Sequence, residues 1–90
     1  MKYEWDEEKN RLNIRKHSID FLDVPSMFQH PMVMFLDQRK DYGEDRWIGV
    51  GILKTILAAV VFTEPNEETI RIISARKATT HEEKIYRDEI

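Results

Sequence analysis

The chain has 90 residues, a formal net charge of −3, and 41% hydrophobic and 34% charged side chains. This length supports one domain over residues 1–90, and its intact apolar runs exclude a disordered chain. The absence of cysteine excludes disulfides and thiolate metal sites. The longest apolar run, Ile56 to Phe62, is too short to cross a bilayer, and no signal segment opens the chain. We therefore expect a cytoplasmic protein with no membrane contact.

The first 17 residues predict a short strand followed by a helix. Tyr3 and Trp5 have the two-residue spacing of one strand face. Asp6 is a favourable N-cap for a helix from about Glu7 to His17, which ends in basic residues where the helix dipole favours them. Because this helix has few apolar residues, we expect much of it to face solvent or a partner.

A second, short helix is predicted after Asp20 or Asp23. Pro25 is unfavourable inside a helix that begins after Asp20, but it fits the first turn of one that begins after Asp23. His30-Pro31 then ends the helix, because the residue before a proline is biased away from helical conformation.

The remaining chain predicts four strands in a meander and a last helix. The strands span Met32–Asp37, Arg46–Ile52, Ile56–Thr63 and Thr69–Arg76. Thr79 opens the last helix, with Glu82 three residues later as in a capping box. The predicted fold class is α+β: an antiparallel sheet, made of a four-stranded meander plus a short N-terminal strand, with helices packed on one face. The less covered face is the expected location of function.

Metal and nucleotide sites have little support in this sequence. The three histidines, His17, His30 and His81, are scattered without ligand spacing, so we expect no metal and no cofactor. No glycine-rich phosphate loop is present. Gly49 and Gly51 alternate with apolar residues on one strand face. Either bulky neighbours pack over them, or their backbone is exposed for a ligand.

What remains is suited to phosphodiester chemistry without a metal. RNA cleavage needs no cofactor when the neighbouring 2′-hydroxyl attacks the phosphorus. The protein then moves protons, which contributes roughly 10²–10⁴-fold, and stabilises charge on the phosphoryl oxygens. The polar residues available for these tasks near the C-terminus and on the first helix are Arg71, Arg76, Lys77, Glu82, Tyr86, Lys16 and His17.

Arg71 and Arg76 are five residues apart, so on a regular strand they face opposite sides. They can share a site only if the strand ends or twists before Arg76. Otherwise one acts on the substrate while the other forms a structural pair with Glu82 or Glu83. The net negative charge argues weakly against nucleic-acid binding. A non-catalytic module that binds nucleic acid or protein is therefore the main alternative function.

The whole sequence resembles the BrnT family of bacterial type II toxins. The resemblance rests on motifs that follow one another in order and cover nearly the full chain. These are Tyr3-Glu4-Trp5-Asp6, Lys9, Asn13, Lys16-His17, Ile19, Phe21, Phe28, Pro31, Asp41-Tyr42-Gly43-Glu44-Asp45-Arg46 and the segment from Arg71 to Tyr86.

This resemblance implies a RelE-like fold and an endoribonuclease that inhibits translation. It also implies a ribbon-helix-helix antitoxin of the BrnA type, encoded beside the toxin, which neutralises it in a hetero-oligomer. The complex then contacts operator DNA only through the antitoxin. By matched position Arg71 and Glu82 are the residues expected to be required for toxicity, and the further candidates are Arg76, Tyr86, Lys16 and His17. Our hypothesis for their roles is that Arg71 stabilises the transition state, Glu82 is the general base, and His17 or Tyr86 is the proton donor. The residues expected to bind RNA are Lys9, Lys16, Arg46 and Lys77.

Two positions depart from the family pattern. Ser18 stands where the family usually has glycine after the first helix, so a left-handed turn there is less favourable. Val24-Pro25-Ser26 replaces a stretch that is alanine-rich helix in relatives. Both changes concern packing and local geometry more than the expected site.

Overall fold

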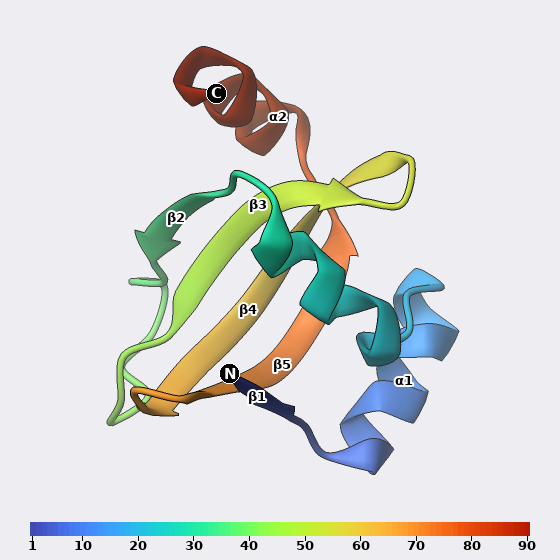
Figure 1. The fold of residues 1–90 in the computed structure, drawn as a ribbon, viewed down its shortest axis with the longest axis vertical. Helices are drawn as coiled ribbons and strands as arrows, with labels where there is room; N and C mark the ends of the chain where they lie inside the picture. Colours follow the sequence, from blue (N-terminus) through green and yellow to red (C-terminus); the bar gives the residue numbers. More distant parts are fainter.

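A computed structural model describes all of residues 1–90 as one five-stranded sheet with three helical segments (Figure 1). The strand order across the sheet is β1-β5-β4-β3-β2. No helix has the length and apolar character needed to span a membrane. In chain order the elements are β1 (Lys2–Glu4), α1 (Glu7–His17), η1 (Phe21–Gln29), β2 (Val33–Leu36), β3 (Trp47–Leu53), β4 (Ile56–Asn66), β5 (Thr69–Lys77) and α2 (Thr80–Glu89).

The sheet is mixed, so the prediction of a purely antiparallel sheet is wrong. Strands β2 to β5 form the expected antiparallel meander, and the tight Lys54-Thr55 turn joins β3 to β4. Strand β1, however, runs parallel to β5, with Tyr3 opposite Ile70. The direction of this strand could not be inferred, because a three-residue edge strand carries a side-chain alternation but no signal for its partner.

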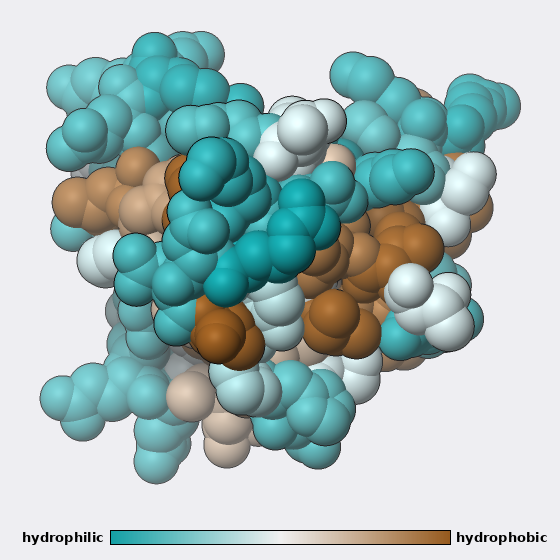
Figure 2. Space-filling model, turned by 90° about the horizontal axis from the view of Figure 1, so that it is seen from above, coloured by the Kyte–Doolittle hydropathy of each residue, from teal (hydrophilic) through white to brown (hydrophobic).

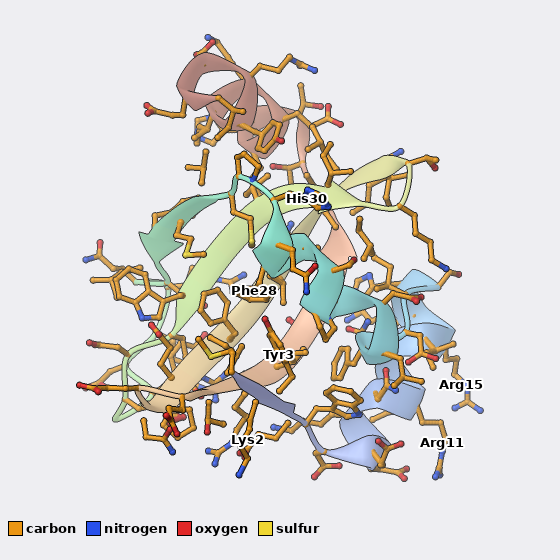
Figure 3. The ribbon with its side chains drawn as sticks, viewed as in Figure 1. Lys2, Tyr3, Arg11, Arg15, Phe28 and His30 are labelled. Atoms are coloured by element: carbon orange, nitrogen blue, oxygen red, sulfur yellow. The ribbon has the colours of Figure 1, made fainter.

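The larger core lies on the face covered by η1. Phe21, Val24 and Met27 of η1 are fully buried against apolar residues of β4 and β5. Tyr3 packs beside Phe28 with ring centroids 5.6 Å apart (Figure 3). Trp5 meets the ring of Phe21 edge-on. Tyr3 and Trp5 thus contribute to one face, as their spacing predicted.

The opposite face carries a second, smaller core. Ile48, Val50, Ala59 and Val61 are buried there, and Tyr86 of α2 packs against them. The expectation that the helices cover one face is therefore wrong, because α2 crosses to the side opposite η1. The chain turns there after Ala78, whose backbone N–H donates to the carbonyl of Leu57 at 2.9 Å. The strand end is thereby fixed where α2 begins.

The second helical segment is a 3₁₀ helix that begins after Asp20, not after Asp23. The Asp20 carboxylate accepts a hydrogen bond from the Leu22 backbone N–H at 3.0 Å. Pro25 lies within the segment. Proline provides no N–H for a helical ladder, while its fixed φ is compatible with 3₁₀ geometry. The segment therefore remains helical without forming regular α-helix.

Gly49 and Gly51 provide space for packing and are not available to a ligand. Both are buried beneath the side chain of Met32. A Cβ atom at Gly49 would lie 2.5 Å from Met32 Cε, and one at Gly51 would lie 2.8 Å from Met32 Cγ. The packing interpretation of these glycines is therefore correct, and the ligand interpretation is wrong.

Two buried asparagines hold the polar helix α1 against the sheet. The Asn13 side chain accepts from the Ala75 backbone N–H at 3.1 Å and donates to the Ala75 carbonyl at 2.9 Å. It thus pairs with the outer edge of β5 as another strand would. Asn10 accepts from the Phe21 backbone N–H at 2.9 Å and connects α1 to η1. Polar contacts replace the apolar face that this helix lacks.

We expect Asn13→Ala to lower the free energy of unfolding by about 2–4 kcal/mol, because it leaves two buried backbone groups of Ala75 unpaired. Urea denaturation measures the change. Arg15→Ala, on the exposed side of the same helix, is the control and should stay within about 0.5 kcal/mol of the unsubstituted chain. Equal effects of the two substitutions would contradict the assigned role of Asn13.

Helix α1 ends at Ser18 in the left-handed conformation, with φ 60° and ψ 29°. This conformation costs a residue other than glycine about 1–2 kcal/mol. Ser18→Gly removes this strain, but ordering the more flexible glycine backbone costs about 0.5–1 kcal/mol on folding. The substitution should therefore stabilise the chain by the difference, roughly 0.5–1 kcal/mol. The midpoint of thermal unfolding should rise. Ser26→Gly is the matched control and should lower it, since the Ser26 hydroxyl donates to the Asp23 carbonyl.

Candidate active site

The sheet face opposite η1 carries a row of polar residues that crosses all five strands. Thr63 of β4 lies opposite Arg71 of β5, and Arg71 lies opposite Glu4 of β1. On the other side of Thr63, the pairing of Trp47 with Phe62 places Arg46 opposite Thr63. Asp37 follows β2 and donates its backbone N–H to the Arg46 carbonyl at 2.7 Å. We call Asp37, Arg46, Thr63, Arg71 and Glu4 the polar row.

A β-bulge in β5 places both strand arginines on this face. Val61 pairs with Ser74, but the next residue of β4 pairs with Ile72, so Ile73 is extra. This additional residue reverses the alternation. Arg71 and Arg76 therefore face the same side, with partners four residues apart on β4, which corresponds to about 13 Å. The two arginines thus share a face because of the inserted residue, and not because the strand ends or twists before Arg76.

Arg76 is held by Glu82 in a bidentate ion pair. The Arg76 Nη1 and Nη2 atoms donate to the two Glu82 carboxylate oxygens at 2.7 and 2.9 Å. The same carboxylate accepts from the Thr79 backbone N–H, which completes the predicted capping box. Hydrogen bonds from Arg76 lower the pKa of the buried Glu82 carboxyl against the opposing effect of desolvation, and Glu82 raises the pKa of Arg76. Both groups stay ionised at neutral pH.

A second arginine held by a carboxylate, Arg39 paired with Asp37, lies across a cleft from this pair. We call each of these two arginine–carboxylate pairs a clamp. The Asp37 carboxylate, which is inaccessible to solvent, accepts from Arg39 Nε and Nη2 at 2.8 Å each. This hydrogen bonding lowers the pKa of Asp37 to about 2. The cleft between the two pairs has a volume of about 360 Å³. Its lining residues are Phe35, Leu36, Asp37, Gln38, Arg39, Ile48, Arg76 and Glu82.

Beside this cleft, Arg46 has no acceptor within the protein. Its guanidinium carbon lies 3.9 Å from the centroid of the Tyr42 ring, whose hydroxyl donates to Asp37 at 3.4 Å. The buried Arg46 Nε and the buried Thr63 hydroxyl both lack a hydrogen-bond partner. Arg71 uses its Nε to contact Glu4 at 2.7 Å and leaves its two terminal nitrogens unpaired. The polar row thus retains unused donors.

Arg71 and Glu82, which the sequence placed in one site, have different partners. Glu82 binds Arg76, whereas Arg71 binds Glu4 at the edge of the sheet. Tyr86 lies in the small apolar core under α2. Lys77 pairs with Ala58, whose side chain belongs to the η1 core. Lys77 is therefore on the face covered by η1, away from Arg76 and Arg71.

The expected basic residues of α1 gather beside β5. Lys9, Lys16 and His17 line a groove together with Ile73 and Ser74. Val61, the partner of Ser74, belongs to the second core, so the groove opens on the same side as Arg76. No set of three or more His, Cys, Asp or Glu side chains is arranged to hold a metal ion.

Comparison with known proteins identifies the family. Residues 5–82 match the family model described as the ribonuclease toxin, BrnT, of type II toxin-antitoxin systems. The chain belongs to this family. The crystal structure of the Brucella abortus ribonuclease toxin BrnT superposes with a TM-score of 0.74 at 33% sequence identity, over 89% of this chain and 99% of that one. No curated protein sequence matches this chain significantly. A ribonuclease toxin of a type II system acts on RNA and has an antitoxin as its partner, which the resemblance predicted.

Sequence reasoning missed Asp37 and Arg39, which line the cleft of this family member, and Tyr42, which contacts Asp37 and Arg46 beside it. These residues lie in the segment between β2 and β3, and none of them was a predicted site residue. Asp37 directly follows β2 and precedes Arg39 by two residues, a spacing that permits the observed side-chain pair. This local signal could have indicated the second clamp.

We expect Asp37→Asn to lower the free energy of unfolding at pH 7 by about 1–3 kcal/mol, because one buried charged acceptor is lost. Folding lowers the pKa of Asp37 to about 2, so its carboxylate stabilises the fold above its ordinary pKa of 3.8. This contribution disappears as the pH falls from about 4 to 2. Urea titrations at pH 7 and pH 2.5 should therefore show a smaller pH-dependent loss in Asp37→Asn than in the unsubstituted chain.

Asp88→Asn is the control for this experiment, because Asp88 forms only an exposed pair with Lys84. Its acid sensitivity should equal that of the unsubstituted chain. If Asp37→Asn also loses stability by the same amount between pH 7 and pH 2.5, the Asp37–Arg39 clamp does not stabilise the folded state.

Proposed function

We propose that the protein is an endoribonuclease that cleaves RNA without a metal and thereby inhibits translation. The observation that supports this most is the pair of arginines across one cleft, each oriented by a buried carboxylate. Donors held in place need little reorganisation as charge develops, which is the condition for strong transition-state stabilisation.

The proposed reaction begins when the 2′-oxygen of a ribose attacks the adjacent phosphorus and loses its proton. The bond from phosphorus to the 5′-oxygen then breaks, and that oxygen takes up a proton. The products are one fragment with a 2′,3′-cyclic phosphate and one with a 5′-hydroxyl. Arg76 and Arg39 are proposed to donate to the phosphoryl oxygens, whose negative charge increases in the transition state.

We propose that Glu82 positions Arg76 and is not the general base. Its carboxylate already accepts three hydrogen bonds, and its lowered pKa makes it a weak base. His17, in the groove on the same side as Arg76, is the proposed proton-transfer group, with Tyr86 as the alternative. Arg71 is proposed to hold a phosphate together with Arg46 across Thr63.

Further contacts to RNA are proposed for Lys9 and Lys16, which line the α1 groove, and for Lys77 at the end of β5. The proposed partner is a ribbon-helix-helix antitoxin of the BrnA type, through which the complex contacts operator DNA. We propose that this hetero-oligomer acts in the cytoplasm. A RelE-like fold is also part of the proposal, supported by an antiparallel meander flanked by an N-terminal helix.

Purified protein incubated with RNA in excess EDTA should produce fragments with cyclic-phosphate ends. Arg76→Ala should reduce the rate by about 10²-fold or more, since it removes fixed donors from the cleft. Arg76→Lys should also be strongly impaired, because lysine lacks the planar fork that Glu82 orients. Fragment ends are measured by enzymatic end-labelling and rates by gel electrophoresis.

Arg87→Ala provides the control, because Arg87 is an exposed arginine of α2 and its removal changes the net charge equally. It should cleave at the unsubstituted rate. Urea denaturation confirms that each variant is folded. RNA that is bound but intact would instead identify a non-catalytic binding module, and cleavage that stops in EDTA would contradict the metal-free mechanism.

A further inference from the structure

We propose that the free edge of β2 binds an extended segment of the antitoxin, which adds a sixth strand to the sheet. β2 lies at one border of the sheet in Figure 1, and no element pairs with its outer side. The proposal rests on the antitoxin partner that family membership implies, and not on the chemistry of RNA cleavage.

The two edges of the sheet differ in their protection. On the β5 side, β1 pairs with Thr69–Arg71, and the Asn13 side chain binds the backbone of Ala75. Nothing comparable covers β2. Because the Asp37 N–H points inward to Arg46, the antiparallel alternation directs the N–H and C=O groups of Met34 and Leu36 outward. These four groups are free to pair with an incoming strand.

The side chains of β2 also favour pairing. The strand reads Val-Met-Phe-Leu and contains neither the charges nor the proline with which natural proteins commonly protect a sheet edge. Met34 and Leu36 are 48% and 40% exposed. Figure 2, viewed from the α2 end, shows hydrophobic side chains at several places among the hydrophilic surface. An added strand would bury these two side chains.

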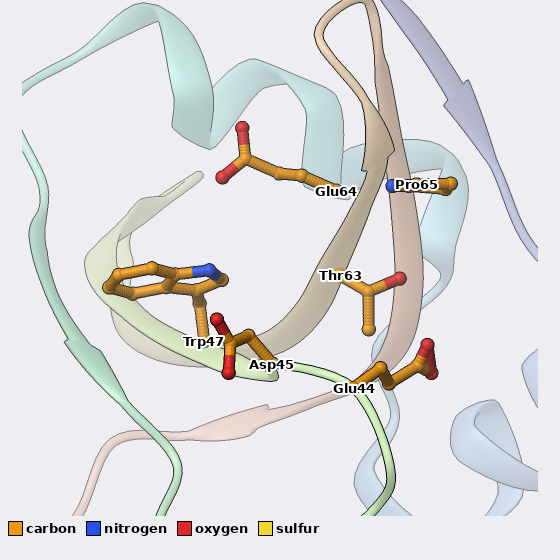
Figure 4. A pocket seen from close by; sticks show the side chains of 6 residues that line it. All are labelled: Glu44, Asp45, Trp47, Thr63, Glu64 and Pro65. Atoms are coloured by element: carbon orange, nitrogen blue, oxygen red, sulfur yellow. The ribbon is translucent and has the colours of Figure 1, made fainter.

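The charge at one end of β2 indicates the chemistry of the partner. Leu36 lies opposite Trp47, which lines a cavity of about 480 Å³ with Glu44, Asp45 and Glu64 (Figure 4). None of these carboxylates forms an ion pair within the protein. A segment with alternating apolar residues and a basic residue beyond them complements this surface. A second copy of a chain with net charge −3 complements it less well.

The position of β2 would also explain neutralisation. Phe35, Leu36 and Asp37 form one wall of the cleft that contains Arg76. A strand paired with the outer side of β2 would therefore lie beside the entrance to the cleft. Its side chains could prevent RNA from reaching the clamped arginines without contacting them. Neutralisation would then need no change in the fold of the toxin.

The first experiment is hydrogen exchange on the full chain, free and in complex with the antitoxin encoded by the neighbouring gene. The amides of Met34 and Leu36 should exchange rapidly in the free protein and at least 10-fold more slowly in the complex. The inward amide of Phe35 is the internal reference, because β3 already protects it. Unchanged exchange at Met34 and Leu36 would overturn the proposal.

The second experiment measures antitoxin binding to variants by calorimetry. Met34→Pro removes one outward donor, and Met34→Lys/Leu36→Lys introduces edge charges at exposed positions. Each variant should weaken the antitoxin affinity at least 10-fold. Leu12→Lys/Ile14→Lys is the matched control, because these α1 residues are similarly exposed, at 53% and 41%. It should bind the antitoxin as the unsubstituted chain does.

If Met34→Pro does not fold, the lysine variant alone tests the proposed strand pairing, because it changes only exposed positions. Unsubstituted affinity in that variant, or a loss confined to the α1 control, would overturn the proposal. Concentration-dependent dimerisation of the free chain with protection of β2 would identify a second copy as the occupant and also overturn it. All binding is measured with Arg76→Lys as background, so that failure of RNA cleavage has no effect on the result.

Discussion

The hydrogen bonds accepted by the Glu82 carboxylate determine both where α2 begins and how Arg76 is oriented in the cleft. It accepts the Thr79 backbone N–H at the start of α2 and holds both terminal nitrogens of Arg76. Helix position and guanidinium orientation are therefore set by one group. Its lowered pKa and the raised pKa of Arg76 reflect the same contact from its two sides. A buried charge of either sign would be costly without the other.

A second constraint is the extra residue in β5. The bulge at Ile73 brings Arg71 and Arg76 to one face and keeps Ile72 and Ala75 in the larger core. A regular strand could not satisfy both requirements, since it would turn one arginine toward the η1 core. The Asn13 side chain pairs with Ala75 two residues beyond the bulge and stabilises the strand where its ladder with β4 is interrupted. The protection of the β5 edge by Asn13 and the placement of the two arginines on one face thus depend on residues only two positions apart, Ala75 and Ile73.

Local sequence signals predicted what depends on local interactions. Asp6 as N-cap, helix α1 and the capping box of Thr79 and Glu82 follow from residues within a few positions of one another. The parallel pairing of β1 and the position of α2 on the second face depend on contacts between distant segments, which one sequence does not encode visibly. The bulge at Ile73 also has no signal, because no glycine or proline accompanies it.

The charge of the site bears on how a protein with a net charge of −3 can bind RNA and also bind the basic antitoxin segment proposed above. Arg39, Arg71 and Arg76 each face a carboxylate, whereas Arg46, Lys40 and the α1 lysines form no ion pair. Attraction of RNA must therefore act at short range, where oriented donors count more than net charge. The proposed basic antitoxin segment would instead be attracted by the net charge of −3 from a greater distance. Docking beside the cleft would use this difference, since the partner gains from the same acidic surface that disfavours RNA.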